Sequence, residues 1–154
     1  MPIPYENLSD LHLIALAIWR EARGEPIEGK RGVAFVIANR VRKPGWWGKD
    51  WKSVILKPWQ FSSFNSNDPN SSKWPTDDSD PTFNDCLTAA YEAHDGLGAD
   101  PTSGAFYYHD TSIPFPKAWG EESQYENTLT VGRLKFYKPI TYSNRDAVQE
   151  ASAG

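Results

Sequence analysis

The most constraining feature of this sequence is a segment that is apolar on nearly every side. From Leu11 to Ala22, apolar residues recur three, four, seven and eleven positions apart, which is the spacing of one helical face. Leu13, Leu16 and Trp19 fill much of the opposite side. A helix of this kind is buried at the centre of a domain, because it has no broad polar face to turn toward water. The rest of the chain is therefore expected to pack around it.

Capping signals define the ends of this helix and the start of a second one. Ser9 is a good N-cap, Gly24 ends the first helix, and Pro26 suits the first turn of the next. The second helix is predicted to run to about Val41, with aliphatic residues along one face. The two helices are thus joined by a very short connection that is rich in charge.

The remainder of the chain predicts shorter elements. Residues 62–80 are dense in Ser, Asn, Asp and Pro and are expected to form a long loop. The other predicted elements are a short helix at 52–57, a helix at 81–94, a strand at 105–109 and a hairpin at 128–137 that turns near Gly132 and Arg133. Helices that precede a small antiparallel sheet indicate a mainly helical α+β fold. We predict one domain over residues 1–142 and a polar tail over residues 143–154.

Composition and charge exclude several classes of function. A formal charge of -4 gives no electrostatic case for nucleic acid or an anionic membrane as partner. We also expect the protein to be a monomer. The longest apolar run, residues 13–19, is too short to span a bilayer. The first twelve residues have no features of a secretory signal, which predicts synthesis in the cytoplasm.

No cofactor or metal is indicated by the sequence. His12, His94 and His109 are too scattered for a metal motif, and Cys86 is the only cysteine. Cys86 as a nucleophile would need a nearby base, and His94 is eight positions away, roughly 12 Å along a helix. We therefore expect Cys86 to belong to the core.

Glu21 stands out as a candidate catalytic acid. On a helical wheel it lies about 80° from Leu11, at the edge of the buried stripe and one turn from the helix end. Partial burial and the negative end of the helix dipole both favour the protonated form of a carboxyl group there. A protonated carboxyl can donate to a leaving oxygen, as glycosidases require. The alternative is a surface ion pair with Arg20 or Arg23.

Arg40 helps to decide whether Glu21 is an acid or part of an ion pair, because Arg40 falls inside the aliphatic stripe of the second helix. A charge there needs a partner, and the connection between the helices offers Glu25 or Glu28. Pairing with Glu21 would work against an acid role. We therefore predict a structural pair of Glu25 and Arg40, which leaves Glu21 as the acid.

The sequence resembles the SleB-type cell wall hydrolases, a family that includes spore cortex-lytic enzymes and related phage lysins. The resemblance rests on four blocks in order, EARGEPIEGKRGVAFVIANRV, VILKPWQFSSF, DPTSGAFYYHD and GRLKFY. It implies a lysozyme-like, transglycosylase-related fold that cleaves peptidoglycan glycan between N-acetylmuramic acid and N-acetylglucosamine. The single essential glutamate of the family maps onto Glu21.

The resemblance also implies substrate-binding residues. They are Gln60, Phe61 and Ser62 of one block, Tyr107 and His109 of another, and Trp59, which departs from the family pattern. On a strand, Tyr107 and His109 share a face that we expect to line the site, while Tyr108 points the other way. Arg20 replaces the usual glycine, which predicts a basic, crowded entrance. Without a recognisable wall-binding repeat, we expect a phage-type lysin that reaches the wall after release by a phage-encoded helper.

Three other functions stay open at this point. A muramidase that hydrolyses the same bond needs a second carboxylate or a held water, and Asp68, Asp77, Asp78 and Asp80 are available in the long loop. A non-catalytic wall-binding module would use Glu21 only as a hydrogen-bonding group. Cleavage of the stem peptides lacks a zinc motif or a convincing nucleophile and base.

Overall fold

The computed structural model describes residues 4–43, 45, 47–57, 61–65, 67–75 and 80–140, with only the backbone at residue 62. The predicted site residues Trp59 and Gln60 lie outside the described residues. So does the predicted polar tail, residues 143–154.

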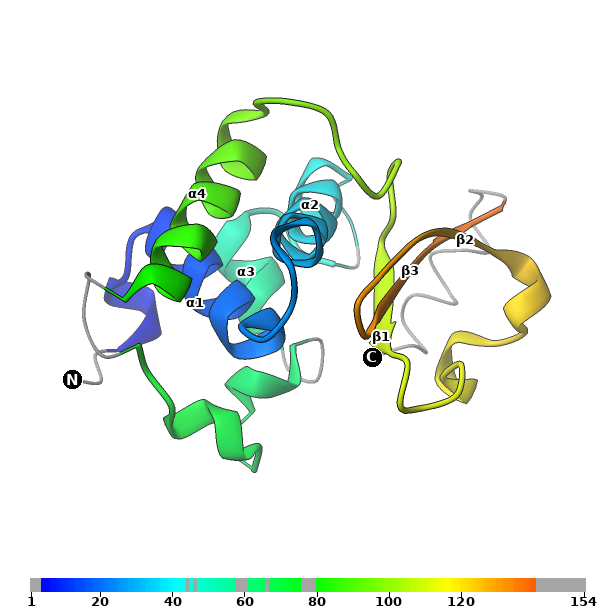
Figure 1. The fold of residues 1–154 in the computed structure, drawn as a ribbon, viewed down its shortest axis with the longest axis horizontal. Coiled ribbons are helices and arrows are strands. Elements are labelled where there is room, and N and C mark those ends of the chain that lie inside the picture. The colour runs from blue at the N-terminus through cyan, green and yellow to red at the C-terminus, as the bar shows by residue number, and fades with distance from the viewer. Residues whose placement is uncertain are drawn as a thin grey trace.

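A buried helix is the centre of the helical part, as predicted. Helix α1 (Asp10–Ala22) is surrounded by α2 (Ile27–Arg42), α3 (Trp51–Leu56) and α4 (Pro81–Asp95). The stretch from Leu13 to Ile18 is buried without interruption. Figure 1 shows α1 and α3 lying behind and between α2 and α4.

The helix ends follow from local hydrogen-bonding chemistry. The Ser9 side chain caps α1, and the Asp80 carboxylate accepts hydrogen bonds from the first free amides of α4. Asp50 and Ser53 form a reciprocal capping box on α3, and the Ser53 amide lowers the pKa of Asp50. Gly96 ends α4 in the left-handed conformation, with φ of 70°. These caps explain why the predicted helix boundaries agree with the structure.

Three antiparallel strands form a sheet beside the helices (Figure 1). They are β1 (Tyr107–Asp110), β2 (Tyr125–Val131) and β3 (Leu134–Pro139), in the order β1-β3-β2. The predicted strand and hairpin are confirmed, although β2 begins earlier than expected. The hairpin turns at Gly132, whose φ of 55° suits glycine.

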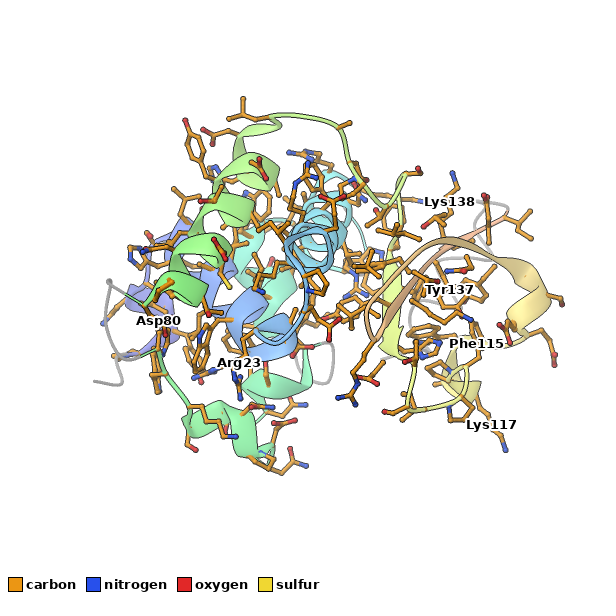
Figure 2. The ribbon with its side chains drawn as sticks, viewed as in Figure 1. Arg23, Asp80, Phe115, Lys117, Tyr137 and Lys138 are labelled. Carbon is orange, nitrogen blue, oxygen red and sulfur yellow. The ribbon has the colours of Figure 1, made fainter. Side chains whose placement is uncertain are left out.

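Both faces of the sheet pack against other parts of the protein. Phe136 of β3 packs toward α2, where it lies directly over Gly32. The opposite face carries Tyr137, which meets Phe115 and Trp119 from the segment that connects β1 to β2 (Figure 2). The hydrophobic core is thus continuous from the helices to the sheet, and its aromatic part on the far face of the sheet is called the second core below.

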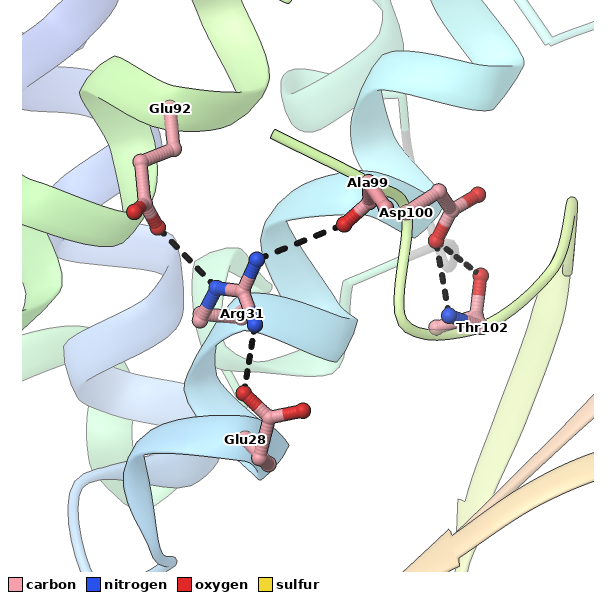
Figure 3. A network of polar contacts seen from close by, with 6 residues as sticks. All are labelled: Glu28, Arg31, Glu92, Ala99, Asp100 and Thr102. Atoms are coloured by element: carbon pink, nitrogen blue, oxygen red, sulfur yellow. Dashed lines mark hydrogen bonds and ion pairs between the residues drawn. The ribbon is translucent and has the colours of Figure 1, made fainter. Parts of the chain in front are cut away.

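A polar network fixes the connection from α4 to β1 (Figure 3). Arg31 of α2 donates to the carboxylates of Glu28 at 2.5 Å and Glu92 at 3.0 Å, and to the Ala99 carbonyl at 3.3 Å. Asp100 accepts hydrogen bonds from both the amide and the hydroxyl of Thr102 at 2.7 Å. The hydrogen bond to Glu28 is the main reason that the pKa of Arg31 is raised. The contact with Ala99 and the turn at Asp100 hold the segment that leads into β1.

The predicted loop at 62–80 contains two short 3-10 turns, η2 (Ser62–Phe64) and η3 (Pro69–Ser72). The Asp68 carboxylate caps η3 by accepting from the amide of Asn70 at 2.8 Å. Among the described residues, none of the helices is both long enough and apolar enough to cross a bilayer.

Substitution of Gly32 by alanine tests the packing of the sheet on α2. An added Cβ would lie 2.5 Å from the Phe136 ring, which is fully buried and has little room to move. We expect Gly32→Ala to lower the free energy of unfolding by about 1–3 kcal/mol, measured by denaturant titration. Gly24→Ala is the matched control, because nothing lies within 4 Å of its Cβ position. Equal effects of the two substitutions would contradict the close contact.

Candidate active site

Glu21 lies in the last turn of α1, where two other segments of the chain meet its carboxyl group. The Tyr108 hydroxyl of β1 donates to Oε1 at 2.8 Å, and the Ser63 amide of η2 donates to Oε2 at 3.3 Å. The side chain is partly exposed, so the carboxyl is oriented from within the protein and still borders solvent.

Glu21 makes no ion pair with any residue that the structure describes. Arg23 lies over the Trp19 ring at 4.5 Å and donates to the Asn70 side chain at 3.1 Å. Arg20 donates to the Tyr5 hydroxyl and to backbone carbonyls of the loop at 63–73. The alternative of a surface ion pair with either arginine is therefore wrong.

The predicted basic entrance at Arg20 is also wrong. Arg20 is only 4% exposed, and its guanidinium group lies inward against the loop. The physical reason is that loop carbonyls near the end of α1 accept hydrogen bonds from the guanidinium, and an aromatic ring lies against it. The positive charge of Arg20 therefore lies inside the protein and not at the entrance of the site.

The predicted orientation of the two tyrosines is reversed. Tyr107 is 1% exposed and packs among Trp47, Trp119 and Tyr125, while Tyr108 reaches Glu21. Alternation along the strand was correct, but both faces of the sheet pack against other parts of the protein, so the pattern did not reveal which face meets α1. Burial, reinforced by the neighbouring Glu21 carboxyl, holds the pKa of Tyr108 well above its usual range. Tyr108 therefore stays protonated and acts as a donor.

His109 shares its face with Tyr107, as predicted, and so lies in the second core. Its ring stacks on Tyr137 at 5.5 Å with an interplanar angle of 11°, and it is 7% exposed. Its Nε2 lies 3.3 Å from the Tyr137 hydroxyl. Phe61 is also buried, at 1% exposure. The substrate-binding roles of Phe61, Ser62 and His109 remain predictions.

The predicted pair of Glu25 and Arg40 is wrong as well. Arg40 is buried in the stripe where the wheel placed it, but its Nε and a terminal nitrogen donate to the Phe106 carbonyl at 2.9 and 2.6 Å. Its guanidinium lies 4.0 Å from the Trp47 ring centre. Glu25 instead accepts from the Arg133 amide at 2.9 Å. Arg40 thus holds the approach to β1, and Glu25 holds the tip of the hairpin.

Comparison with known proteins assigns the chain to a family. A family model described as Cell Wall Hydrolase matches residues 24–137. The chain belongs to the cell wall hydrolase family. Glu21 lies just before the matched range, and Tyr108 lies within it.

Two spore cortex-lytic enzymes are similar in sequence. The enzyme of Bacillus subtilis is 32% identical over 122 residues, which cover 78% of this chain and 35% of that protein. The enzyme of Halalkalibacterium halodurans is 34% identical over 109 residues, which cover 70% and 29%. The chain thus spans about a third of the length of these relatives.

Two solved structures share the fold. The catalytic domain of the Bacillus cereus SleB protein has a TM-score of 0.64 and 28% identity, covering 84% of this chain and 89% of that domain. The catalytic domain of the germination-specific lytic transglycosylase SleB from Bacillus anthracis has the same TM-score and identity, covering 88% and 100%. The predicted family resemblance and the mainly helical α+β fold are confirmed.

The structure also places the cysteine and the residue types that could bind a metal. Among the residues that the structure describes, no group of three or more His, Cys, Asp or Glu side chains could hold a metal ion. Cys86 is fully buried on α4, and desolvation raises its pKa to about 12. His94 contacts its neighbour Asp95 at 2.7 Å. Cys86 is therefore a core residue, as predicted.

The Cys86 thiol provides a test of this placement. With a pKa of about 12 it stays neutral and buried throughout the neutral range, and a neutral thiol is a poor nucleophile. We expect the native protein to resist a colorimetric disulfide reagent at pH 8 and to react with one equivalent after denaturation. Cys86→Ala is expected to keep wild-type activity. Rapid labelling of the native protein would contradict a buried, protonated thiol.

Proposed function

We propose that this chain degrades peptidoglycan by cleaving the glycan bond between N-acetylmuramic acid and N-acetylglucosamine, as a lytic transglycosylase with Glu21 as its catalytic acid and base. The observation that carries the proposal is the geometry of the Glu21 carboxyl, which is oriented by Tyr108 and Ser63 and makes no described ion pair. Family membership and the similarity to the lytic transglycosylase SleB of Bacillus anthracis support the reaction class.

One carboxyl group is sufficient for this reaction. Glu21 gives its proton to the glycosidic oxygen as the bond from C1 of the muramic residue breaks, which releases the N-acetylglucosamine hydroxyl. The resulting carboxylate then takes a proton from the C6 hydroxyl of the same muramic residue while that oxygen bonds to C1. The product is a 1,6-anhydromuramic end, and Glu21 is again protonated. No water is consumed.

Tyr108 and the Ser63 amide suit both halves of this cycle. Each donates to a different oxygen of Glu21, so the carboxyl plane is fixed while both oxygens keep a second lone-pair direction. Because Tyr108 stays protonated, its hydroxyl hydrogen remains available to the carboxylate formed after the first proton transfer. The pair therefore orients Glu21 without supplying a competing charge.

A muramidase that hydrolyses the same bond is the nearest alternative. It needs a second carboxylate or a held water on the opposite face of the sugar. Asp68 and Asp80 are occupied as caps of η3 and α4, which favours the single-carboxyl reaction. Asp77 and Asp78 lie outside the described residues. The type of product separates these two reactions.

The biological setting is a further proposal. We keep the prediction of a phage-type lysin, made in the cytoplasm, that reaches the wall with a phage-encoded helper. The two relatives similar in sequence are spore cortex-lytic enzymes, so they do not test this setting. The test is to express the chain with and without a membrane-permeabilising helper and to follow lysis of the culture.

Substitution of Glu21 by glutamine tests the proposed function. We expect Glu21→Gln to release soluble fragments from purified peptidoglycan about 100- to 10,000-fold more slowly, because the amide cannot donate or accept the transferred proton. Binding to insoluble peptidoglycan is expected to persist. Glu28→Gln is the matched control, since it removes only a surface ion pair with Arg31.

The fragments released by the wild type identify the reaction when they are analysed by mass spectrometry. Ends of 1,6-anhydromuramic acid support the transglycosylase, and reducing muramic ends support the muramidase. Undiminished release by Glu21→Gln would reject Glu21 as the catalyst. If the wild type binds several wall types and releases nothing, the chain is a non-catalytic wall-binding module.

Removal of the Tyr108 hydroxyl tests the orientation of the carboxyl. We expect Tyr108→Phe to lower the rate about 10- to 100-fold through misorientation of Glu21, with a loss of only about 1 kcal/mol in the free energy of unfolding. Tyr107→Phe is the comparison, because that ring lies on the other face of the sheet, and it is expected to keep the wild-type rate. The reverse order of the two variants would contradict the structure.

A further inference from the structure

Ser63 connects two neighbouring residues of α1 through its backbone. Its amide donates to Oε2 of Glu21 at 3.3 Å, and its carbonyl accepts from the Arg20 guanidinium at 3.3 Å. Ser63 is 1% exposed; its contact with Arg20 is buried, and its contact with Glu21 is partly buried. The position of the amide on Glu21 is therefore linked to the position of Arg20.

Arg20 is itself held from several directions. Its Nε donates to the Lys73 carbonyl at 3.0 Å, one terminal nitrogen donates to the Ser71 carbonyl at 3.0 Å, and the other reaches the Tyr5 hydroxyl at 2.8 Å. Three rings surround the guanidinium at 4.9–5.3 Å, those of Tyr5, Phe64 and Trp74. The group has little freedom to move, and it joins η1 (Tyr5–Asn7), η2, η3 and α1.

The choice of arginine at this position calls for an explanation. A buried cation is costly unless it is paired, yet in the described part of the chain Arg20 makes no ion pair and its hydrogen-bond acceptors are neutral. A guanidinium offers five donors in one rigid plane, which a neutral side chain cannot supply. This plane serves the oxygens of Tyr5, Ser63, Ser71 and Lys73 at the same time.

We propose that Arg20 is a positioning residue for Glu21, acting through the Ser63 backbone, and that the N-terminal turn contributes to the site through Tyr5. This inference rests on the proposed function of Glu21. Arg20 does not touch the substrate. It fixes the loop that aims the Ser63 amide, so its loss misorients the Glu21 carboxyl and slows the chemical step while leaving substrate contacts elsewhere intact.

The kinetic test compares Arg20→Gln with Arg42→Gln on soluble glycan strands. Arg42 also donates to a backbone carbonyl, that of Ala93 at 2.7 Å. It is the last residue of α2 and has no contact with Ser63 among the described hydrogen bonds. We expect Arg20→Gln to lower kcat about 10- to 100-fold with KM changed less than about threefold, and Arg42→Gln to leave kcat unchanged. Tyr5→Phe, which removes one partner of Arg20, is expected to lower kcat in the same sense and by less. It keeps the test decisive if Arg20→Gln fails to fold.

A second readout does not depend on catalysis. The amide proton shift of Ser63, followed by NMR, is expected to change in Arg20→Gln and in Glu21→Gln and to stay unchanged in Arg42→Gln. Wild-type kcat in a folded Arg20→Gln variant, or an unchanged Ser63 amide, would overturn the inference. If the amide responds as expected but Glu21→Gln remains fully active, the link between Arg20 and Ser63 stands and the proposed function fails.

Discussion

Two ionisable side chains at the end of a buried helix impose the main constraint on this structure. Arg20 and Glu21 are adjacent in α1, and neither pairs with the other in the described structure. Each must be satisfied by polar groups from elsewhere, because a polar group without a hydrogen-bond partner is costly near a core. Loop carbonyls and Tyr5 receive Arg20, while Tyr108 and the Ser63 amide receive Glu21. The candidate site lies where these segments contact the end of α1.

The sheet contributes by being held from both sides. On one side Phe136 sits over Gly32, and on the other Tyr137 and His109 pack in the second core. Arg40 fixes the Phe106 carbonyl just before β1, and Glu25 fixes the hairpin tip at Arg133. A strand fixed at these points presents Tyr108 to Glu21 in one orientation. The aromatic residues of the second core therefore help to hold the strand that carries the Tyr108 hydroxyl.

Local patterns in the sequence predicted what depends on local chemistry. The helices, their caps, the hairpin turn and the place of Glu21 on α1 all follow from periodicity and capping residues. The hydrogen-bond partners that lie far apart in the sequence did not follow from these patterns. Arg40 bonds to a carbonyl 66 residues away, and backbone acceptors leave no mark in a sequence. Ser63 was missed for the same reason, since it acts through its amide. Alternation correctly placed Tyr107 and Tyr108 on opposite faces of the strand, but it could not show which face meets Glu21 of α1.

In the proposed reaction, one carboxyl group moves the proton in both directions and no water enters. Digestion of purified glycan strands in water enriched in heavy oxygen tests this directly, with mass spectrometry of the new muramic ends. A single-carboxyl transglycosylase produces 1,6-anhydro ends that carry no heavy oxygen, and this is the result we predict. One heavy oxygen atom at each new reducing end would contradict the single-carboxyl reaction and identify a hydrolase.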